Sequence, residues 1–185
     1  MTQQQYSPMQ TVKRRFFAMR NGVVADTLRS AGSPYKVIFG LNLPQIVDIA
    51  RDMAPDRTLA EELWANKTTR ESQLAAPMIM PRESFTVDDA RRWCASIADR
   101  ESADILCHRL LRYLPYAAAL AAELVDTRCG TECYAGMRLA MNILYGQPAA
   151  AKAIARKVLD SAADCPADAL AVARALLDEA EVCGI

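Results

Sequence analysis

The sequence predicts an all-α protein in which helix pairs stack into an α-α superhelix. A block that opens on Arg-Glu-Ser and runs into an apolar helix begins at Arg70 and again at Arg100, each time after a helix that carries a tryptophan, and a weaker copy begins at Thr131. The glutamates at positions 71, 101 and 132 are 30 and 31 residues apart, a period typical of two-helix repeats that bury their apolar faces only against neighbouring repeats. Seven glycines, nine prolines and no alternating β-branched runs leave little material for a sheet.

Length and composition predict one domain over residues 1–185. A chain of 185 residues that is 52% hydrophobic and 24% charged can bury one sizeable core. Its longest apolar stretch, residues 113–125, is interrupted by Pro115 and Glu123 and is shorter than the roughly twenty residues of a membrane span. We therefore expect no membrane partner and, in the absence of a secretory signal, a cytoplasmic protein.

Caps and breakers delimit the expected helices of the first half, which cover residues 9–19, 23–30, 43–53 and 57–65. Asn21-Gly22 ends the first of these helices, and a Gly-Ser-Pro sequence from Gly32 ends the second. Asn42, followed by Leu43-Pro44, is a predicted N-cap, and Asp56 begins the fourth helix.

Further helices are expected on both sides of the second tryptophan. Thr68 with Glu71 predicts a capping box for a helix that ends by Pro77, and Thr86 with Asp89 predicts a second box. Apolar side chains recur at helical spacing over residues 101–113 and 132–145, and Tyr134 belongs to the expected buried face of the second of these helices. Trp64 and Trp93 precede the Arg-Glu-Ser triplets at matching places, so repeat packing accounts for them better than base stacking.

A polar stripe flanks the apolar face of the helix over residues 101–113. Asp104, His108 and Arg112 are spaced four residues apart, so they are neighbours on the helix surface. Arg138 and Asn142 occupy the equivalent flank of the next helix. Together with this stripe, a ladder at the repeat period is expected to line a concave face; its members are Gln73, Asp104, Arg138 and Arg174.

Charge is unevenly distributed although the formal net charge is zero. Residues 1–40 carry six bases against Asp26 alone, whereas residues 121–185 carry six bases against nine acids. A site for a polyanion should therefore use the N-terminal half, where Lys36 lies. The pI near 6.6 argues against tight non-specific DNA binding.

The six cysteines predict neither disulfides nor a metal site. The chain contains no Cys-x-x-Cys pair, and only His108 could complete a ligand set around Cys129 and Cys133. Small buried thiols are the expectation, without metal or organic cofactor.

The order of several short segments is similar to that of a known family. The segments are Tyr35-Lys36-Val37, Leu43 to Ala50, Leu59 to Trp64, Arg70-Glu71 and Trp93, and the similarity covers most of residues 10–145. In this order they resemble the DNA alkylation repair family of HEAT-like (armadillo-like) repeat proteins. The resemblance implies an alkylpurine DNA glycosylase-like fold whose positively charged concave surface holds duplex DNA and excises N3- or N7-alkylated purines without a cofactor.

The resemblance also implies roles for particular residues. Asp104 matches the family's catalytic aspartate, a carboxylate that would stabilise positive charge on the deoxyribose. Arg138 matches an arginine that contacts DNA near the lesion. The other expected DNA contacts are Arg100, His108, Arg112 and Lys36.

Departures from the family pattern leave the catalytic function open. Arg100 stands where the pattern has an aromatic residue, and no tryptophan follows around residues 174–179. Asp104 and Arg138 could instead form an ion pair that sets the packing of two helix hairpins, and His108 could be a solvated or capping residue. Three functions follow: a DNA glycosylase, a non-catalytic binder of DNA structures, or a scaffold for a protein partner.

Overall fold

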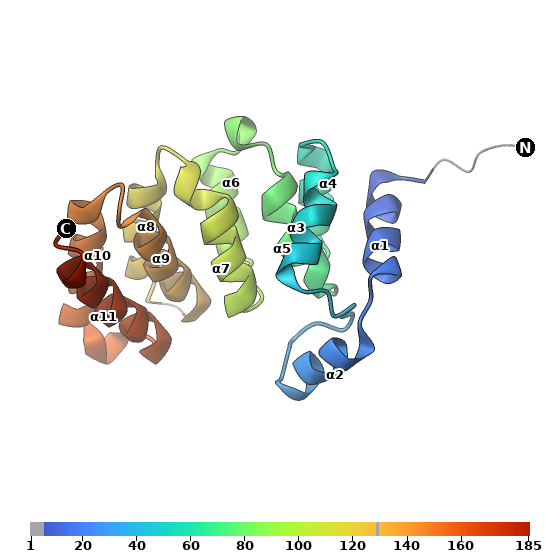
Figure 1. Cartoon of the computed structure of the whole chain (residues 1–185). Helices are drawn as coiled ribbons and strands as arrows, with labels where there is room; N and C mark the ends of the chain where they lie inside the picture. Colours follow the sequence, from blue (N-terminus) through green and yellow to red (C-terminus); the bar gives the residue numbers. More distant parts are fainter. Residues whose placement is uncertain (1–5, 129) are drawn as a thin grey trace, which may run out of the picture. The chain divides into compact units, whose positions relative to one another are not determined.

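Helices make up the regular structure of the protein. The computed structural model describes residues 6–128 and 130–185 (Figure 1). Within these ranges there is no strand, only an isolated bridge between Val37 and Thr69, so the all-α prediction is confirmed. The chain divides into two compact units, residues 1–84 (unit 1) and 85–185 (unit 2), which are described separately. One repeat domain over the whole chain stays a prediction.

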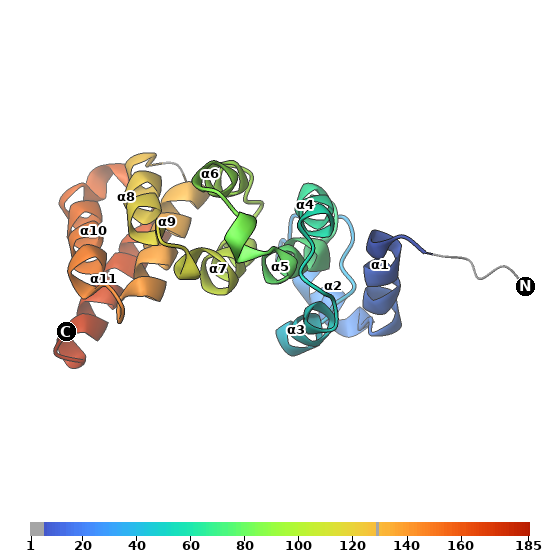
Figure 2. The same cartoon turned by 90° about the horizontal axis from the view of Figure 1, so that it is seen from above.

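Unit 1 has five α-helices in the part that the structure describes: α1 (Pro8–Ala18), α2 (Gly22–Ser30), α3 (Leu43–Arg51), α4 (Arg57–Ala65) and α5 (Arg70–Ile79). The four helices predicted for the first half are confirmed to within two residues. Asn42 caps α3 through a capping box with Gln45, and the Asp56 side chain caps α4. The helix α5 packs against both α3 and α4, and Figure 2 shows these three helices end-on. Trp64 is buried, as predicted.

The capping box predicted for α5 is wrong, because Glu71 bonds elsewhere. The N-cap of α5 is Thr69, which makes no side-chain cap bond. The fully buried Glu71 carboxylate instead accepts main-chain N–H bonds from Phe39 at 3.1 Å, Gly40 at 3.0 Å and Leu41 at 3.4 Å. Arg70, also buried, pairs with Glu71 at 3.2 Å and donates to the Leu41 carbonyl at 2.9 Å. The Arg70–Glu71 pair therefore holds the loop of residues 35–41 against α5.

The predicted end of α5 at Pro77 is also wrong, because the helix continues to Ile79. Pro77 lies in the last turn, where its missing N–H removes one main-chain bond and its fixed φ still fits a helix. Upstream, the Gln73 amide donates to the carbonyls of Leu63 and Trp64, which ties α5 to the end of α4.

A close approach of main chains fixes the loop of residues 35–41 against α2. Asn21 donates its N–H to the Phe39 carbonyl at 2.8 Å. Gly40 follows with a φ of +78°, and a Cβ there would lie 2.1 Å from the Asn21 carbonyl oxygen. Only glycine fits this position.

Unit 2 has six α-helices in its described part: α6 (Val87–Cys94), α7 (Arg100–Arg109), α8 (Ala117–Asp126), α9 (Gly130–Ile143), α10 (Pro148–Asp160) and α11 (Ala167–Val182). The capping box of Thr86 and Asp89 opens α6 as predicted. The helix predicted over 101–113 ends early: α7 stops at Arg109, and a 3-10 turn (Leu111–Tyr113) follows.

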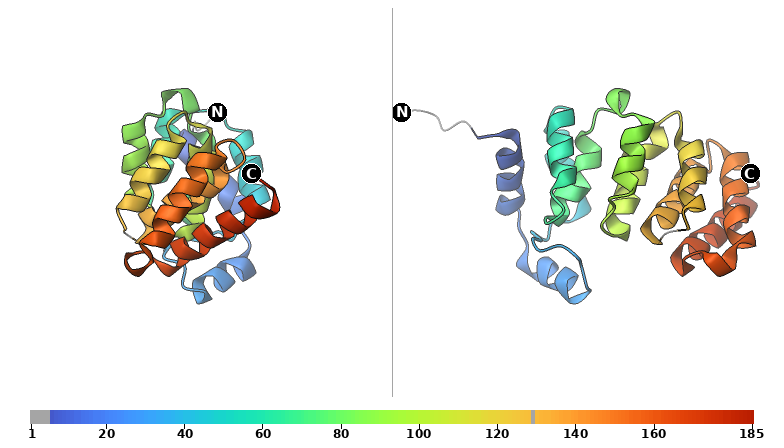
Figure 3. Two further views of the ribbon diagram at one scale, coloured as in Figure 1. Left: turned by 90° about the vertical axis from the view of Figure 1, so that its left-hand side faces the viewer. Right: turned by 180° about the vertical axis from the view of Figure 1, so that it is seen from behind.

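Helix α9 is the centre of unit 2, because it packs against α7, α8, α10 and α11. Figure 3 shows these helices from two further sides, with α8 and α9 in yellow to light orange and α10 and α11 in orange to red. A Cβ at Gly136 would lie 2.9 Å from the Ala121 carbonyl oxygen, so α8 and α9 approach closely there. Trp93 is fully buried and meets Phe85 edge-on at 5.0 Å. Within the described ranges, no helix is long and apolar enough to cross a membrane.

Candidate functional site

The predicted catalytic aspartate lies at the junction of α7 and α9. Asp104 Oδ1 accepts a bond from Arg138 Nε at 2.6 Å and another from the Tyr134 hydroxyl at 3.0 Å. The three side chains come together because residues 104 and 108 on α7 face residues 134, 138 and 142 on α9, which are spaced four residues apart. Sequence reasoning thus predicted the two polar flanks, and the structure shows that they face each other. We call Asp104, Tyr134 and Arg138 the aspartate cluster.

The aspartate cluster is partly open to solvent. The side chains of Asp104 and Arg138 are 35% and 33% exposed. Both bonds to Asp104 end on Oδ1, so Oδ2 accepts none from any residue that the structure describes. The bond from Arg138 uses Nε, which leaves the two terminal nitrogens of the guanidinium to bind another group. The ion pair considered as an alternative is therefore formed, yet it keeps one unused acceptor and two unused donors.

Tyr134 is a member of the cluster that the sequence analysis placed only in the core. Burial is the main cause that raises the pKa of its hydroxyl to about 12, and the Asp104 charge and bond add to the effect. The phenol therefore stays protonated near neutral pH and donates to Asp104. Its position four residues before Arg138 was a signal in the sequence, because both side chains lie on one flank of α9.

His108 does not bind Asp104, although it lies one turn away on α7. Its Nδ1 lies 3.0 Å from Oδ1 of Asn142, and the Asn142 amide donates to the Arg138 carbonyl at 2.7 Å. His108 is exposed. The contact extends the polar seam between α7 and α9 by one turn beyond the aspartate cluster.

Arg100 lies beside the aspartate cluster at the start of α7. Its guanidinium carbon is 5.8 Å from the centroid of the Tyr134 ring, and its Nε pairs with Asp168 at 2.5 Å. The Arg100 side chain is 68% exposed. A cation therefore lies next to Tyr134 at the place where the family pattern has an aromatic residue.

The predicted helical stripe does not extend to Arg112. Because α7 ends at Arg109, Arg112 lies in the following 3-10 turn, where its guanidinium packs over the Tyr113 ring at 4.5 Å. Lys36 belongs to unit 1, where it is exposed in the loop that follows α2.

Gln73 does not take part in the predicted surface ladder. It is fully buried, and its amide is used by main-chain carbonyls. Asp104 and Arg138 bind each other instead of occupying separate rungs, and Arg174 is exposed on α11. The repeat period therefore placed Asp104 and Arg138 on facing helices. It did not distinguish a surface position from a core position, because it also included the buried Gln73.

The cysteines of the described ranges are free thiols in different environments. Cys94, Cys107 and Cys133 are buried as predicted, Cys165 is half-buried and Cys183 is exposed. Burial raises the pKa of Cys94 to about 12 and holds that of Cys107 well above its ordinary value, so both are poor nucleophiles. Among the described residues, no group of three or more His, Cys, Asp or Glu could hold a metal ion. Cys129 lies outside those residues.

Comparisons with known proteins place the chain in a family. A family model described as "DNA alkylation repair enzyme" matches residues 12–144. A solved structure of a protein from "a new family of proteins related to the HEAT-like repeat DNA glycosylases with affinity for branched DNA structures" superposes with a TM-score of 0.79 at 16% sequence identity, over 94% of this chain and 76% of that one. This match confirms the predicted HEAT-like repeat fold. No curated protein matches the chain significantly.

Proposed function

The chain belongs to the DNA alkylation repair enzyme family, and from this membership we propose that it is a repair protein that binds DNA at the seam between α7 and α9. The observation that carries the proposal is the partly exposed Arg138, which pairs with Asp104 through Nε and whose terminal nitrogens bond to no residue that the structure describes. A guanidinium oriented in this way can donate two bonds to a phosphate. His108 and Asn142 provide further polar groups one turn along the seam.

Branched DNA is the substrate class that we favour over plain duplex. The structurally similar protein belongs to a family with affinity for branched DNA structures, which supports this choice. Arg100 supports it as well, because an exposed arginine beside the aspartate cluster suits a phosphate better than the positively charged base of an alkylated purine. The aspartate cluster is thus proposed to hold the DNA backbone.

Base excision is the second candidate function, and the free Oδ2 of Asp104 is the observation that favours it. A purine alkylated at N3 or N7 carries a positive charge and leaves readily, so the enzyme mainly has to stabilise the oxocarbenium charge on the sugar and orient a water. A partly exposed carboxylate oxygen can do both. Arg138 at 2.6 Å offsets the charge of Asp104, and Arg100 would repel a cationic base. Binding without excision is therefore our conclusion.

Salt-dependent binding tests the proposed function. Fluorescence anisotropy would compare a labelled four-way junction with a linear duplex of the same length over a range of salt concentrations. We expect tighter binding to the junction, and we expect Arg138→Ala to reduce the slope of log K against log salt by about 1, since one phosphate contact is lost.

The matched control is Arg156→Ala, which removes an exposed arginine of α10 in the same unit. It should bind both DNAs more like the wild-type protein than Arg138→Ala does. Equal effects of the two substitutions, or affinity for DNA that ignores salt, would contradict the proposal. Absence of DNA binding together with a co-purifying protein would favour the scaffold function.

Excision is tested separately by base release. Methylated duplex DNA would be incubated with the wild-type protein and with Asp104→Asn, and free 7-methylguanine and 3-methyladenine would be measured by chromatography. Our conclusion predicts no release by either protein. Release by the wild-type protein that is abolished in Asp104→Asn would establish the second candidate instead, because Asn keeps the shape of the side chain and removes its charge.

A further inference from the structure

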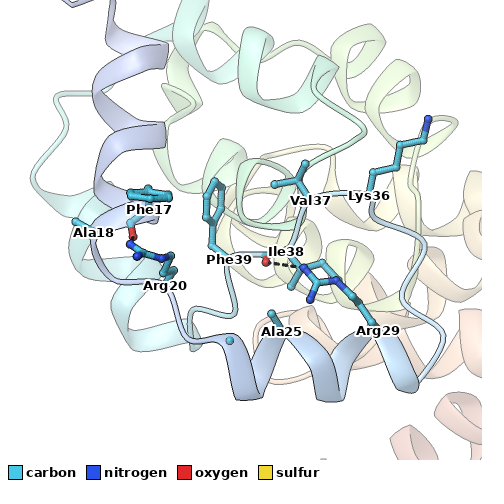
Figure 4. A pocket seen from close by; sticks show the side chains of 10 residues that line it. Phe17, Ala18, Arg20, Ala25, Arg29, Lys36, Val37, Ile38 and Phe39 are labelled. Carbon is cyan, nitrogen blue, oxygen red and sulfur yellow. Dashed lines mark hydrogen bonds between the residues drawn. The ribbon is translucent and has the colours of Figure 1, made fainter.

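Two neighbouring pockets lie at the C-terminal end of α1 in unit 1. The first, about 650 Å³, is lined by residues of α1, α2 and the loop 36–39, and Figure 4 shows it. The second, about 740 Å³, lies along α1 and includes Tyr6. Phe17, Ala18 and Phe39 line both pockets. The two pockets therefore share a wall made of aromatic side chains.

Basic side chains line both pockets. Arg20, Arg29 and Lys36 line the first, and Lys13 and Arg14 line the second. Residues 1–40 contain one acid, Asp26, which pairs with Arg29 at 2.7 Å. The other four bases surround the pockets without a carboxylate partner among the described residues. The pockets thus have a positive charge that a polyanion would complement.

Aromatic rings in the pockets are exposed and carry stacked arginines. Phe17 is 56% exposed and Tyr6 is 42% exposed. The guanidinium carbon of Arg20 lies 4.0 Å from the centroid of the Phe17 ring, and that of Arg14 lies 4.2 Å from the centroid of the Tyr6 ring. A guanidinium stacked on a ring can still donate from its edge to a phosphate. One terminal nitrogen of Arg20 donates to the Phe17 carbonyl at 2.9 Å, so a phosphate would bind the rest of that guanidinium edge. Each pair therefore presents an apolar ring and a phosphate donor at the same place.

We propose that these pockets form a second nucleic-acid site, which binds the unpaired nucleotides of a single strand. Its members, which we call the N-terminal surface, are Tyr6, Lys13, Arg14, Phe17, Arg20 and Lys36. Unpaired bases expose π-faces that stack on aromatic side chains, and their backbone follows positive charge. A duplex keeps its nucleobases stacked inside. Its phosphates would therefore contact the basic side chains of this surface, and the aromatic rings would stay in water. An acidic peptide would likewise neutralise the charge without using the rings.

The structure already holds the N-terminal surface in place. Arg15, which follows Arg14, pairs with Asp52 at 2.6 Å and donates to the Ile49 carbonyl, which fixes α1 against the end of α3. Phe16 is fully buried and packs on Phe39 with ring centroids 6.0 Å apart. Phe17 thereby faces outward from a rigid support, so ligand binding need not order it. This site is separate from the aspartate cluster, and it stands whether or not the proposed function is correct.

The test compares two single strands that differ only in their bases. Fluorescence anisotropy would measure the binding of a labelled oligothymidine and of an abasic oligomer with the same number of phosphates. The wild-type protein should prefer oligothymidine, and Phe17→Ala should lower the affinity for oligothymidine by about 5- to 100-fold and abolish the preference. Lys13→Gln and Lys36→Gln should weaken binding to both oligomers alike and lower the salt dependence.

The control variant is Val23→Ala, which truncates a side chain of α2 that is 78% exposed and lines neither pocket. It should bind oligothymidine like the wild-type protein. Circular dichroism would check that Phe17→Ala is folded, as its exposure predicts. Equal affinity of the wild-type protein for the two oligomers, tighter binding of polyglutamate than of oligothymidine, or an unaltered Phe17→Ala would overturn the proposal. Arg138→Ala should keep the preference for oligothymidine over the abasic oligomer, because that preference depends on the rings of the N-terminal surface, so this site and the aspartate cluster can fail independently.

Discussion

The two Arg-Glu-Ser triplets that define the repeat have the same three residues and different roles. In unit 1, Arg70, Glu71 and Ser72 are all buried, and Glu71 binds three main-chain N–H groups of the loop 35–41. In unit 2, Arg100 is largely exposed and Glu101 is partly exposed. Both triplets begin a helix, but the first also fixes a loop, whereas the second lies beside the aspartate cluster.

The difference between the two triplets arises from the structure that surrounds each of them. The first triplet faces a loop whose N–H groups need a buried acceptor, because an unpaired buried donor is costly. The helix with the second triplet begins with a capping box between Asp99 and Ser102, which occupies its N-terminal donors. A further Arg-Glu-Ser sequence, Arg82–Ser84, forms a 3-10 turn with no buried member. The role of the triplet therefore depends on its surroundings.

The largest effect is expected from removing the carboxylate of the first triplet. Glu71→Ala removes the carboxylate that pairs with the buried Arg70 and that accepts the N–H groups of Phe39, Gly40 and Leu41. We expect a loss of about 3–5 kcal/mol in the free energy of unfolding, measured by urea titration. Because the loop carries Lys36 and Phe39, oligothymidine binding should weaken as well.

The equivalent change in the second triplet, Glu101→Ala, is the matched control. Because Glu101 is partly exposed, its loss should change the unfolding free energy by less than about 1 kcal/mol. Similar losses of unfolding free energy for Glu71→Ala and Glu101→Ala would show that both glutamates stabilise the fold to the same extent. They would contradict the proposed difference between the two triplets.

A substitution at Gly40 tests the loop from its other side. In Gly40→Ala, the added Cβ would meet the Asn21 carbonyl oxygen, and the residue would have to keep its positive φ. We expect a loss of about 1–3 kcal/mol, measured by thermal unfolding followed by circular dichroism. Gly32→Ala shares the positive φ but meets no atom within 4 Å, so it should cost less. Equal costs would mean that backbone strain alone, without the contact to α2, accounts for the effect.

The two predicted capping boxes provide the next contrast. Thr86 caps α6 in unit 2, whereas Thr68 makes no bond to α5 and instead donates to the Asn66 side chain at 2.8 Å. Thr86→Ala should cost about 1 kcal/mol, and Thr68→Ala less than about 0.5 kcal/mol, both by urea titration. A larger cost for Thr68→Ala would indicate that its bond to Asn66 matters more to the start of α5 than a cap would.

The sequence predicted the helices well, because caps and breakers act locally. Asn42, Asp56 and Thr86 cap the helices at which they were expected. The failures at Thr68 and Pro77 have a tertiary cause: Glu71 is used by a loop thirty residues away, and the packing of α5 carries the helix past Pro77. Such long-range partners leave no trace in local spacing.

The candidate site was predicted in part. The equivalent flanks of α7 and α9 were predicted, since helical spacing fixes which side chains share a face. Asp104 and Arg138 form the ion pair that was considered as an alternative to separate places in a ladder. Tyr134 was assigned to the core because its ring is apolar and lies at the spacing of the buried face. The partner of its hydroxyl, Asp104, is on another helix and is known only from the structure. The positive charge of the N-terminal surface was predicted from the excess of basic residues. The exposure of Phe17 could not be predicted, because the sequence does not distinguish it from its buried neighbour Phe16.

A small effect on stability is expected at Arg100, the first residue of the second triplet. Arg100→Ala removes the pair with Asp168, whose other oxygen keeps its bond from the Ala169 N–H at 2.9 Å. Because Arg100 is 68% exposed and Asp168 keeps its bond from Ala169, the unfolding free energy should change by at most about 1 kcal/mol. Its effect on function should be larger than on stability, since the substitution removes the cation next to Tyr134 and should weaken binding to the four-way junction. A loss of several kcal/mol, with junction binding unchanged, would instead make Arg100 a structural residue like Arg70 and would erase the distinction between the two triplets.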